Sequence, residues 1–151
     1  MSRESRNEQL FDEMSAFNRK LRAFFDAAVR EEGLTLARAR ALFALSRRGP
    51  LTQKELAEEL EIETPTLVRV LDGMARQDLI VRTEDATDRR AKRIDMTPAG
   101  RLAFERMHVL ATDLRGEIAT DISEEDIDTA LSVVRRLMRN LQHLDQGKVL
   151  P

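Results

Sequence analysis

Two helix starts lie close together in the middle of the chain, and this spacing constrains the fold more than any other feature. Thr52 and Glu55 have the pattern of a capping box, in which the hydroxyl accepts from one free backbone N–H and the carboxylate from another. The apolar pattern then breaks at residues 61–63, and Thr64 followed by Pro65 predicts a second N-cap and first helical position. Two short helices joined by so tight a turn indicate a helix-turn-helix.

The second of these helices is predicted to have one buried face and one exposed face. Its apolar residues recur at i, i+3, i+4 and i+7, as on one side of a helix: Leu67, Val70, Leu71 and Met74. The same rotation turns a short, mostly polar set outward: Thr66, Arg69, Gly73 and Arg76. Arginine is a forked donor of the kind that reads guanine in the major groove, so we expect residues 64–77 to form a recognition helix for DNA.

A hairpin is predicted directly after this helix. Residues 79–83 and 92–96 have the pattern of strands, and the turn formers 85–88 lie between them. Basic residues crowd the far side of the turn: Arg89, Arg90, Lys92 and Arg93. A protruding hairpin with arginines near its tip can enter a narrow minor groove. Solvated hairpin charges are the alternative, but the position directly after a helix-turn-helix favours a DNA-binding wing.

Four short segments carry a resemblance to a known family: residues 64–69 (TPTLVR), 79–82 (LIVR), 88–90 (DRR) and 96–100 (MTPAG). Together they resemble the MarR family of winged-helix repressors, and the run 88–94 (DRRAKRI) is similar to its SlyA branch. One departure is Asp78, where the family usually has the glycine that ends the recognition helix. Aspartate tolerates the left-handed conformation better than most residues, so we expect the helix end to be preserved.

The expected DNA contacts combine base reading with phosphate binding. Val68 is placed against a thymine methyl, Arg90 in the minor groove, and Gln53 on a phosphate at a helix N-terminus. The other wing cations are expected along the backbone, and the resemblance implies that Asp88 holds the wing arginine in place. The complete predicted set is Gln53, Thr64, Pro65, Thr66, Val68, Arg69, Arg82, Asp88, Arg89, Arg90 and Lys92.

Both ends of the chain carry an apolar seam. Over residues 10–29 apolar residues alternate spacings of four and three, and a last helix from about 123 to 144 repeats the pattern. We expect the two seams to pair across a two-fold axis in a homodimer, with packing inside the same subunit as the alternative for the first. The predicted dimerisation residues are Leu10, Met14, Ile127, Val134, Leu137, Leu141 and Leu144.

The expected fold class is mainly α with a small β-hairpin wing, a winged helix-turn-helix with N- and C-terminal dimerisation helices. Gly33 ends the first helix, and Thr35, Thr97 and Ser123 are N-caps of later ones. The coarse order is α-α-α-α-β-β-α-α, with a third short strand near Leu51. The predicted division is residues 1–34 for dimerisation, 35–97 for DNA binding and 98–151 for dimerisation.

The family resemblance also implies a small effector, an aromatic carboxylate or a phenol, bound between the helical base and the winged lobe. Such a ligand acts on DNA binding through its differential affinity for two conformations. The candidate lining residues are Phe17, Leu21, Phe24, Phe25, Leu36 and Phe43. Ordinary core packing is the alternative interpretation of this apolar set.

Residue content argues against an enzyme or a metalloprotein. The chain has no cysteine, which excludes disulfides, thiolate ligands and thiol-based sensing. His108 and His143 lie on different predicted helices, without the spacing of a metal site. A glycine-rich phosphate loop and a nucleophile elbow are also missing from the sequence. We therefore predict no enzymatic activity, no metal and no cofactor.

Charge is unevenly distributed along the chain. The formal net charge is −2, yet four of the five residues 89–93 are basic, whereas residues 117–128 carry six acidic side chains and no basic one. The near-neutral sum leaves an alternative function, a winged-helix protein–protein assembly module without sequence-specific DNA binding. The sequence has no apolar run of membrane-spanning length and begins without a signal peptide, so we expect a cytoplasmic protein without a membrane partner.

Overall fold

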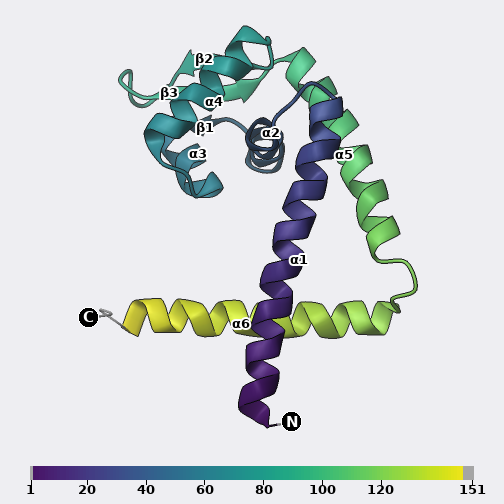
Figure 1. The fold of residues 1–151 in the computed structure, drawn as a ribbon. Helices are drawn as coiled ribbons and strands as arrows, with labels where there is room; N and C mark the ends of the chain where they lie inside the picture. Colours follow the sequence, from purple (N-terminus) through teal and green to yellow (C-terminus); the bar gives the residue numbers. More distant parts are fainter. Residues whose placement is uncertain (1, 148–151) are drawn as a thin grey trace. The chain divides into compact units, whose positions relative to one another are not determined.

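The computed structural model describes residues 2–147 and separates into two compact units, Met1–Ala111 and Thr112–Pro151. Each unit is described by itself. The elements, labelled in Figure 1, are α1 (Arg3–Glu31), α2 (Leu36–Arg48), β1 (Leu51–Thr52), α3 (Gln53–Leu60), α4 (Thr64–Arg76), β2 (Ile80–Glu84), β3 (Lys92–Met96), α5 (Pro98–Ile118) and α6 (Glu124–Gly147).

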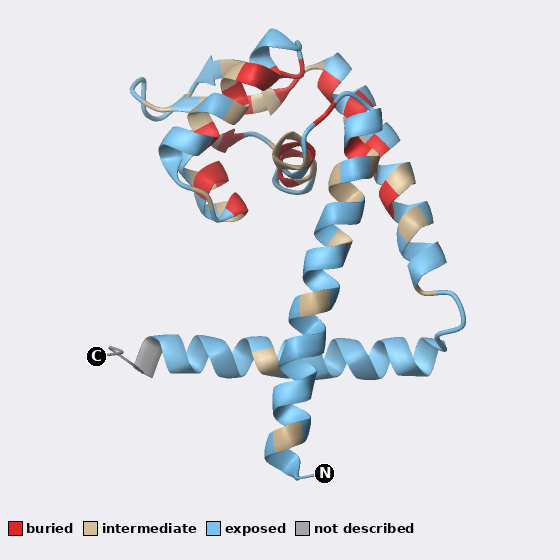
Figure 2. Ribbon diagram, viewed as in Figure 1, coloured by how far each residue is buried: buried red, intermediate tan, exposed pale blue. Residues whose placement is uncertain are grey.

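The core of the first unit is built around α2, which contacts α1, α3, α4 and β3. Figure 2 shows the buried residues gathered over the short helices and the sheet rather than along α1. The largest fully buried side chains are all apolar, and five of the eight are leucines: Leu42, Leu45, Leu56, Leu67, Leu71, Met74, Ile94 and Met107. Among the described residues this core contains no buried polar or charged side chain, so apolar burial holds the unit together.

Local capping explains where most helices begin. The hydroxyls of Thr35 and Ser123 accept from the backbone N–H groups three residues ahead, at 3.3 and 3.1 Å, which confirms both predicted caps. Gly33 has φ +75° and ends α1 as predicted. However, α1 starts at Arg3, because Ser2 caps it before the apolar pattern begins.

The sheet has three antiparallel strands in the order β1-β3-β2. Leu51 lies opposite Ile94, so the predicted third strand is confirmed. In the wing hairpin Arg82 also lies opposite Ile94, and Glu84 lies opposite Lys92 at the end next to the loop. This register leaves residues 85–91 as the wing tip.

The start of α5 is packed tightly against the end of α4. Thr97 accepts from the N–H of Gly100 at 2.9 Å through its hydroxyl, and its own N–H donates to the carbonyl of Leu79 at 3.1 Å. A Cβ on Gly100 would lie 1.9 Å from that carbonyl oxygen. Only glycine therefore allows this close approach, which fixes where the wing returns to the helical part of the unit.

The second unit contains the end of α5 and the whole of α6. Figure 2 shows α6 exposed along most of its length. The exposed residues include apolar ones such as Leu141, which is 62% exposed. The predicted fold class is confirmed, since the chain is mostly helical with one small sheet. No helix within residues 2–147 combines the length and apolar character needed to cross a membrane.

Candidate nucleic-acid interface

The predicted recognition helix, α4, has its N-cap one residue earlier than expected. Thr64 is the first helical residue rather than the N-cap, which is Glu63 with φ −65° and ψ 142°. Proline is tolerated throughout the first turn because the N–H groups there have no partner inside the helix, so Pro65 does not mark one position uniquely. The Glu63 side chain makes no capping hydrogen bond with any described residue, and the Thr64 side chain is exposed on the first turn.

The two faces of α4 are separated as the sequence predicts, except at Gly73. Leu67, Leu71 and Met74 are completely buried. Thr66 and Arg69 are exposed on the outer side, and so are Thr64 and Pro65, whereas Val68 is half-buried. Within the described residues the Arg69 guanidinium forms no ion pair or hydrogen bond with protein. The N-terminal half of α4 thus presents polar and basic groups to solvent.

Gly73 does not face outward as expected. It is buried, and the guanidinium of Arg38 from α2 lies over it: a Cβ at this position would be 2.3 Å from Arg38 Nη2. The helical period correctly places Gly73 on the same side of α4 as Thr66 and Arg69. It could not show that a side chain of another helix covers this side at Gly73. The exposed face of α4 is therefore interrupted at Gly73, and Arg76 beyond it is exposed as predicted.

The end of α4 confirms the expectation for Asp78. This residue has φ +57°, its N–H donates to Ala75 O at 3.0 Å, and the N–H of Leu79 donates to Met74 O at 2.9 Å. These two bonds make a Schellman motif, which usually contains glycine at the left-handed position. An aspartate accommodates the same geometry here.

The start of α3 places Gln53 at the first helical position, where it is half-buried. The predicted capping box is present: Glu55 N donates to Thr52 Oγ at 3.2 Å, and Thr52 N donates to the Glu55 carboxylate at 2.7 Å. The backbone N–H of Thr52 lowers the pKa of Glu55, followed in effect by its hydroxyl. An N-terminal turn with free N–H groups is a suitable position for phosphate.

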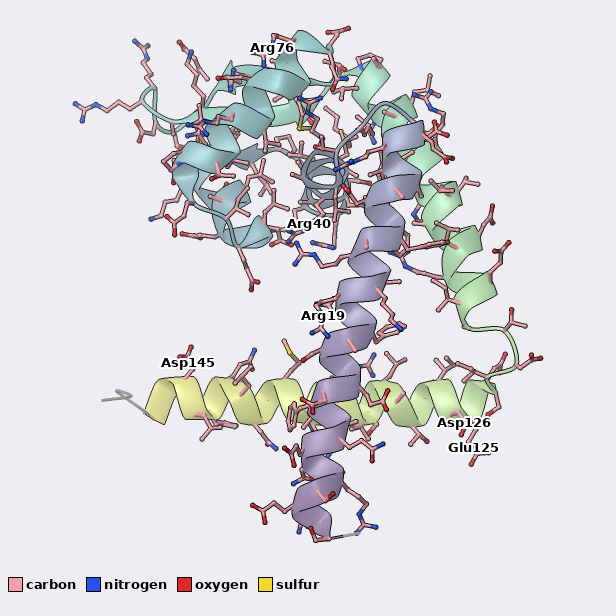
Figure 3. The ribbon with its side chains drawn as sticks, in the orientation of Figure 1. Arg19, Arg40, Arg76, Glu125, Asp126 and Asp145 are labelled. Atoms are coloured by element: carbon pink, nitrogen blue, oxygen red, sulfur yellow. The ribbon has the colours of Figure 1, made fainter. Side chains whose placement is uncertain are left out.

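The turn between α3 and α4 is supported from α2. Glu61 adopts a left-handed conformation (φ +53°), and Ile62 N donates to Ala57 O at 3.1 Å. Arg40, labelled in Figure 3, donates through Nη2 to Leu60 O at 3.0 Å. A guanidinium from the neighbouring helix therefore fixes the carbonyl that would otherwise lack a partner at the end of α3.

Two further arginines of α2 serve the fold. Arg47 and Arg48 both bond the Glu59 carboxylate on α3, the second at 2.9 Å. The hydrogen bond from Arg48, then that from Arg47, lowers the pKa of Glu59. Arg38 and Arg40 of the same helix also have protein partners, so all four arginines of α2 are engaged within the protein.

The wing tip is ordered by two aspartates. Asp85 accepts from the backbone N–H and the hydroxyl of Thr87, both at 3.2 Å. Asp88 accepts from the backbone N–H of Arg90 at 2.9 Å. Asp88 thus holds the main chain of the wing arginine rather than its guanidinium. Arg89 and Arg90 are exposed, and neither side chain has a protein partner among the described residues.

The base of the wing is fixed by Arg93. Its Nη1 donates to Pro50 O at 2.8 Å, and its Nε lies 3.5 Å from the Asp85 carboxylate. The backbone N–H of Thr87 is the largest cause that lowers the pKa of Asp85, and Arg93 adds to it. Lys92, next to Arg93 on the strand, is exposed.

Arg82 is engaged within the protein, whereas the sequence placed it along the DNA backbone. Its Nη2 donates to Asp72 Oδ1 of α4 at 2.8 Å. The pair joins the wing to the recognition helix, with Arg82 30% and Asp72 46% exposed at the side chain. Sequence reasoning missed this contact because nothing in either element alone pairs the two residues.

The predicted dimerisation residues lie on α1 and α6. Six of them are exposed in the single chain, from 36% for Met14 to 62% for Leu141: Leu10, Met14, Ile127, Val134, Leu141 and Leu144. Leu137 is half-buried. An exposed apolar face of this extent is unusual on a helix unless another surface covers it.

The predicted ligand residues have different environments. Phe17 and Phe24 are exposed, Leu21 and Phe25 are half-buried, and Leu36 packs against the core of the first unit. Phe43 also packs there, in an aromatic cluster that the sequence did not single out. Its ring meets Phe104 edge-on at 5.2 Å, and Phe104 stacks on His108 at 5.6 Å. An open groove on α1 has a different, polar lining: Ser5, Glu8, Gln9, Asp12, Glu13 and Ala16.

Comparison with known proteins identifies the family. A model of the MarR family matches residues 32–91, from the end of α1 through the wing tip. The solved structure of the transcriptional regulator PA3341 is 34% identical, with a TM-score of 0.80 over 89% of this chain and 98% of that chain. The chain belongs to the MarR family. The family resemblance found in the sequence is therefore confirmed.

More distant MarR-family structures share the fold. The MarR family transcription regulator SP03579 has a TM-score of 0.84 at 20% identity, over 95% of this chain and 97% of its own. Staphylococcus aureus MarR, solved in complex with salicylate and kanamycin, has a TM-score of 0.83 at 20% identity, over 93% and 95%. MarR-family regulators are transcription factors rather than enzymes, which confirms that prediction for this chain.

Proposed function

We propose that this MarR-family regulator is a homodimer that binds an inverted repeat in double-stranded DNA. Its recognition helix, residues 64–77, enters the major groove, and its wing, residues 79–96, enters the minor groove. In this arrangement residues 1–34 and 98–151 serve dimerisation and residues 35–97 serve DNA binding. The wing sequence 88–94 further suggests the SlyA-like branch of the family, and we place the protein in the cytoplasm.

One observation carries the proposal, the division of arginines in the winged helix into two groups. Those of α2 and of the wing base bond to carboxylates or carbonyls of the protein: Arg38, Arg40, Arg47, Arg48, Arg82 and Arg93. The guanidiniums of Arg69, Arg76, Arg89 and Arg90 have no protein partner among the described residues. These four lie on the outer face of α4 and on the wing tip, where a winged helix meets DNA.

Each predicted contact residue has a proposed role. Arg69 reads guanine, Thr64 and Thr66 contact base edges or phosphates beside it, and half-buried Val68 touches a thymine methyl. Pro65 shapes this first turn. On the wing Arg90 enters the minor groove, and the backbone contacts come from Arg89, Lys92 and, at the start of α3, Gln53.

Arg82 receives a revised role. Because its guanidinium bonds Asp72 of α4, we assign it to holding the wing beside the recognition helix. Asp88 likewise supports the wing tip through the N–H of Arg90 and contacts no base. Both residues act on DNA binding through the position of other groups.

The dimer sets the geometry of the operator. The exposed apolar faces of α1 and α6 supply surface for a second copy. Two recognition helices related by a two-fold axis match half-sites about one helical turn, roughly 34–36 Å, apart. With about 6–10 phosphates contacted, affinity should fall about a thousandfold or more between roughly 50 and 200 mM salt.

A small aromatic acid or phenol is the proposed effector class. The family resemblance and the salicylate complex of Staphylococcus aureus MarR support it. The candidate lining remains Phe17, Leu21, Phe24, Phe25, Leu36 and Phe43. Titration with millimolar salicylate should lower affinity for the operator, and unchanged affinity would count against this effector class.

The test of DNA reading compares an unpartnered arginine with an engaged one. Duplexes selected from a random pool supply an operator, and fluorescence anisotropy then measures affinity for it and for a scrambled duplex. We expect Arg69→Ala to lose about tenfold in the ratio of the two affinities, since a good bidentate base contact contributes roughly 1–3 kcal/mol. Arg47→Ala removes the same charge from an arginine held by Glu59 and should leave the ratio unchanged.

The outcomes separate the possibilities. An equal loss on both duplexes would reduce Arg69 to a phosphate contact. If the wild-type protein showed no salt-dependent binding to any duplex, the DNA-binding function would be rejected in favour of a winged-helix assembly module.

A further inference from the structure

Gln77, the C-cap of α4, forms hydrogen bonds through both the oxygen and the nitrogen of its side-chain amide. Its Oε1 accepts from Arg38 Nη1 of α2 at 2.8 Å. Its Nε2 donates to the carbonyl of Gly33, between α1 and α2, at 3.3 Å. Arg38 and Gly33 lie 39 and 44 positions before Gln77 in the sequence. One side chain therefore ties the last turn of the recognition helix to the segment that joins the first two helices.

The chemistry of the partners allows only one orientation of this amide. A guanidinium has donors only, so it requires the Gln77 oxygen, and a backbone carbonyl is an acceptor only, so it requires the nitrogen. Glutamine supplies both groups from one planar unit. A residue with a single kind of polar group would satisfy one partner and lose the other.

Gly73 gives independent support for this arrangement. It lies one turn before Gln77 on the same side of α4, and the absence of a side chain there leaves room for Arg38. An added Cβ would lie 2.3 Å from Arg38 Nη2 and 2.9 Å from Cζ. Glycine in the middle of a helix is unfavourable relative to alanine, so the space for the guanidinium comes at a cost to α4 itself.

Arg38 and Gly33 belong to one rigid segment. Gly33 has φ +75° and donates to Arg30 O at 3.0 Å, and the next residue, Leu34, is buried. Thr35 then caps α2 by accepting from the N–H of Arg38 at 3.3 Å. Both partners of Gln77 therefore belong to the turn between α1 and α2 and the first turn of α2 that follows it. The end of α4 is held against this segment.

We propose that Gln77 and Arg38 are positioning residues for DNA reading: they fix the end of α4 on the turn between α1 and α2 and thereby set how Thr66 and Arg69 meet base edges. The ion pair of Asp72 with Arg82 holds α4 to the wing, so this contact is the second of two lateral restraints. The inference rests on the proposed DNA-binding function. If it holds, Gln77 and Arg38 influence the specificity of DNA binding although neither contacts DNA.

Gly73→Ala is the sharpest test, because specificity should fall without any loss of stability. The new methyl meets only the far end of the Arg38 side chain, which can swing away, and alanine favours the helix. We expect a melting temperature equal to or above that of wild type. The ratio of operator affinity to scrambled-duplex affinity should nevertheless fall about fivefold, the factor that corresponds to the free energy of one lost hydrogen bond.

Variants at position 77 test the amide directly. Gln77→Ala removes both bonds and should lower the affinity ratio about fivefold or more, whereas Gln77→Glu keeps the acceptor for Arg38 and should retain most of it. Arg106→Gln is the matched control, since it breaks a link from α5 to Glu32 beside the same turn without touching α4. That variant should leave the ratio unchanged.

The result that overturns the inference is a wild-type affinity ratio in both Gly73→Ala and Gln77→Ala while wild type itself prefers the operator. In that case the contact is structural only and the proposed function stands. If wild type prefers no duplex, the DNA-binding function fails and the inference with it. A loss of ratio in Gly73→Ala and Gln77→Ala, but not in Gln77→Glu or Arg106→Gln, supports the positioning role.

Discussion

The helices α4 and α6 carry the same kind of sequence pattern but differ in what covers it. Each has apolar residues at alternating spacings of three and four. On α4 the stripe formed by Leu67, Leu71 and Met74 is completely buried, and α4 packs against α2, α3 and the sheet of the same chain. On α6 the stripe stays exposed, with Val134 at 43% and Leu141 at 62%.

This difference separates a helix that the chain folds by itself from one that needs a further surface. Burial of apolar area stabilises α4 in its place and leaves its polar face free for DNA. The exposed stripe of α6 is the feature that the proposed homodimer would use. The comparison therefore predicts that the two helices respond differently to the same truncation.

The largest effect is expected in α4. Leu71→Ala should lower the free energy of unfolding by about 3 kcal/mol, because the side chain is completely buried and leaves a cavity. Chemical denaturation at several protein concentrations measures this, and the loss should not depend on concentration. Leu141→Ala is the matched truncation in α6, and an equal, concentration-independent loss there would erase the comparison.

The next effect concerns assembly. Val134→Ala combined with Leu141→Ala should weaken the dimer by about 2 kcal/mol, since both side chains would be buried only against a second copy. Sedimentation equilibrium gives the dissociation constant, and circular dichroism should show an unchanged helical content. A double variant that dimerises like wild type would show that the partner does not cover this stripe.

A smaller change is expected at the wing. Arg90→Ala should weaken binding to most duplexes by about tenfold or more through the loss of one minor-groove cation, while the dimer persists. Arg101→Ala removes an equal charge from an exposed position on α5. In anisotropy titrations only the first should lose affinity, and equal losses would reduce the wing contact to net charge.

The smallest effect should come from acid. The hydrogen bonds from Arg48 and Arg47 lower the pKa of Glu59 in the folded protein. The stabilisation is therefore fully present above about pH 4.3, the ordinary glutamate pKa, and is lost as pH falls through the lower folded-state value. Unfolding measured from neutral pH to about pH 3 should show a smaller decline in Glu59→Gln than in wild type. An identical decline in both would remove Glu59 from the acid response.

Local chemistry explains which parts of the fold were predictable. The capping hydroxyls of Thr35, Thr52 and Ser123 act within three residues, so the sequence alone located these helix starts. The first turns of α1 contain no apolar residue to reveal a period, and its start was therefore missed. At α4 the tolerance of proline in the first turn shifted the predicted boundary by one residue.

The site residues were predictable where their role depends on exposure to solvent. They were not predictable where their role depends on a side-chain contact with another element. Arg69, Arg89 and Arg90 were identified from their positions on a helix face and a turn, although their contact with DNA stays a prediction. The partners of Arg38 and Arg82 lie 39 and 10 residues away on other elements. Such contacts follow from packing between elements, which no periodicity in one element reports.

Selection of duplexes from a random pool tests the central claim most directly, because the recovered motif reports base reading and pairing of subunits together. The account predicts an inverted repeat whose half-sites are centred about one helical turn, roughly 34–36 Å, apart. A pool without enrichment, or an enriched motif that lacks two-fold symmetry, would contradict it.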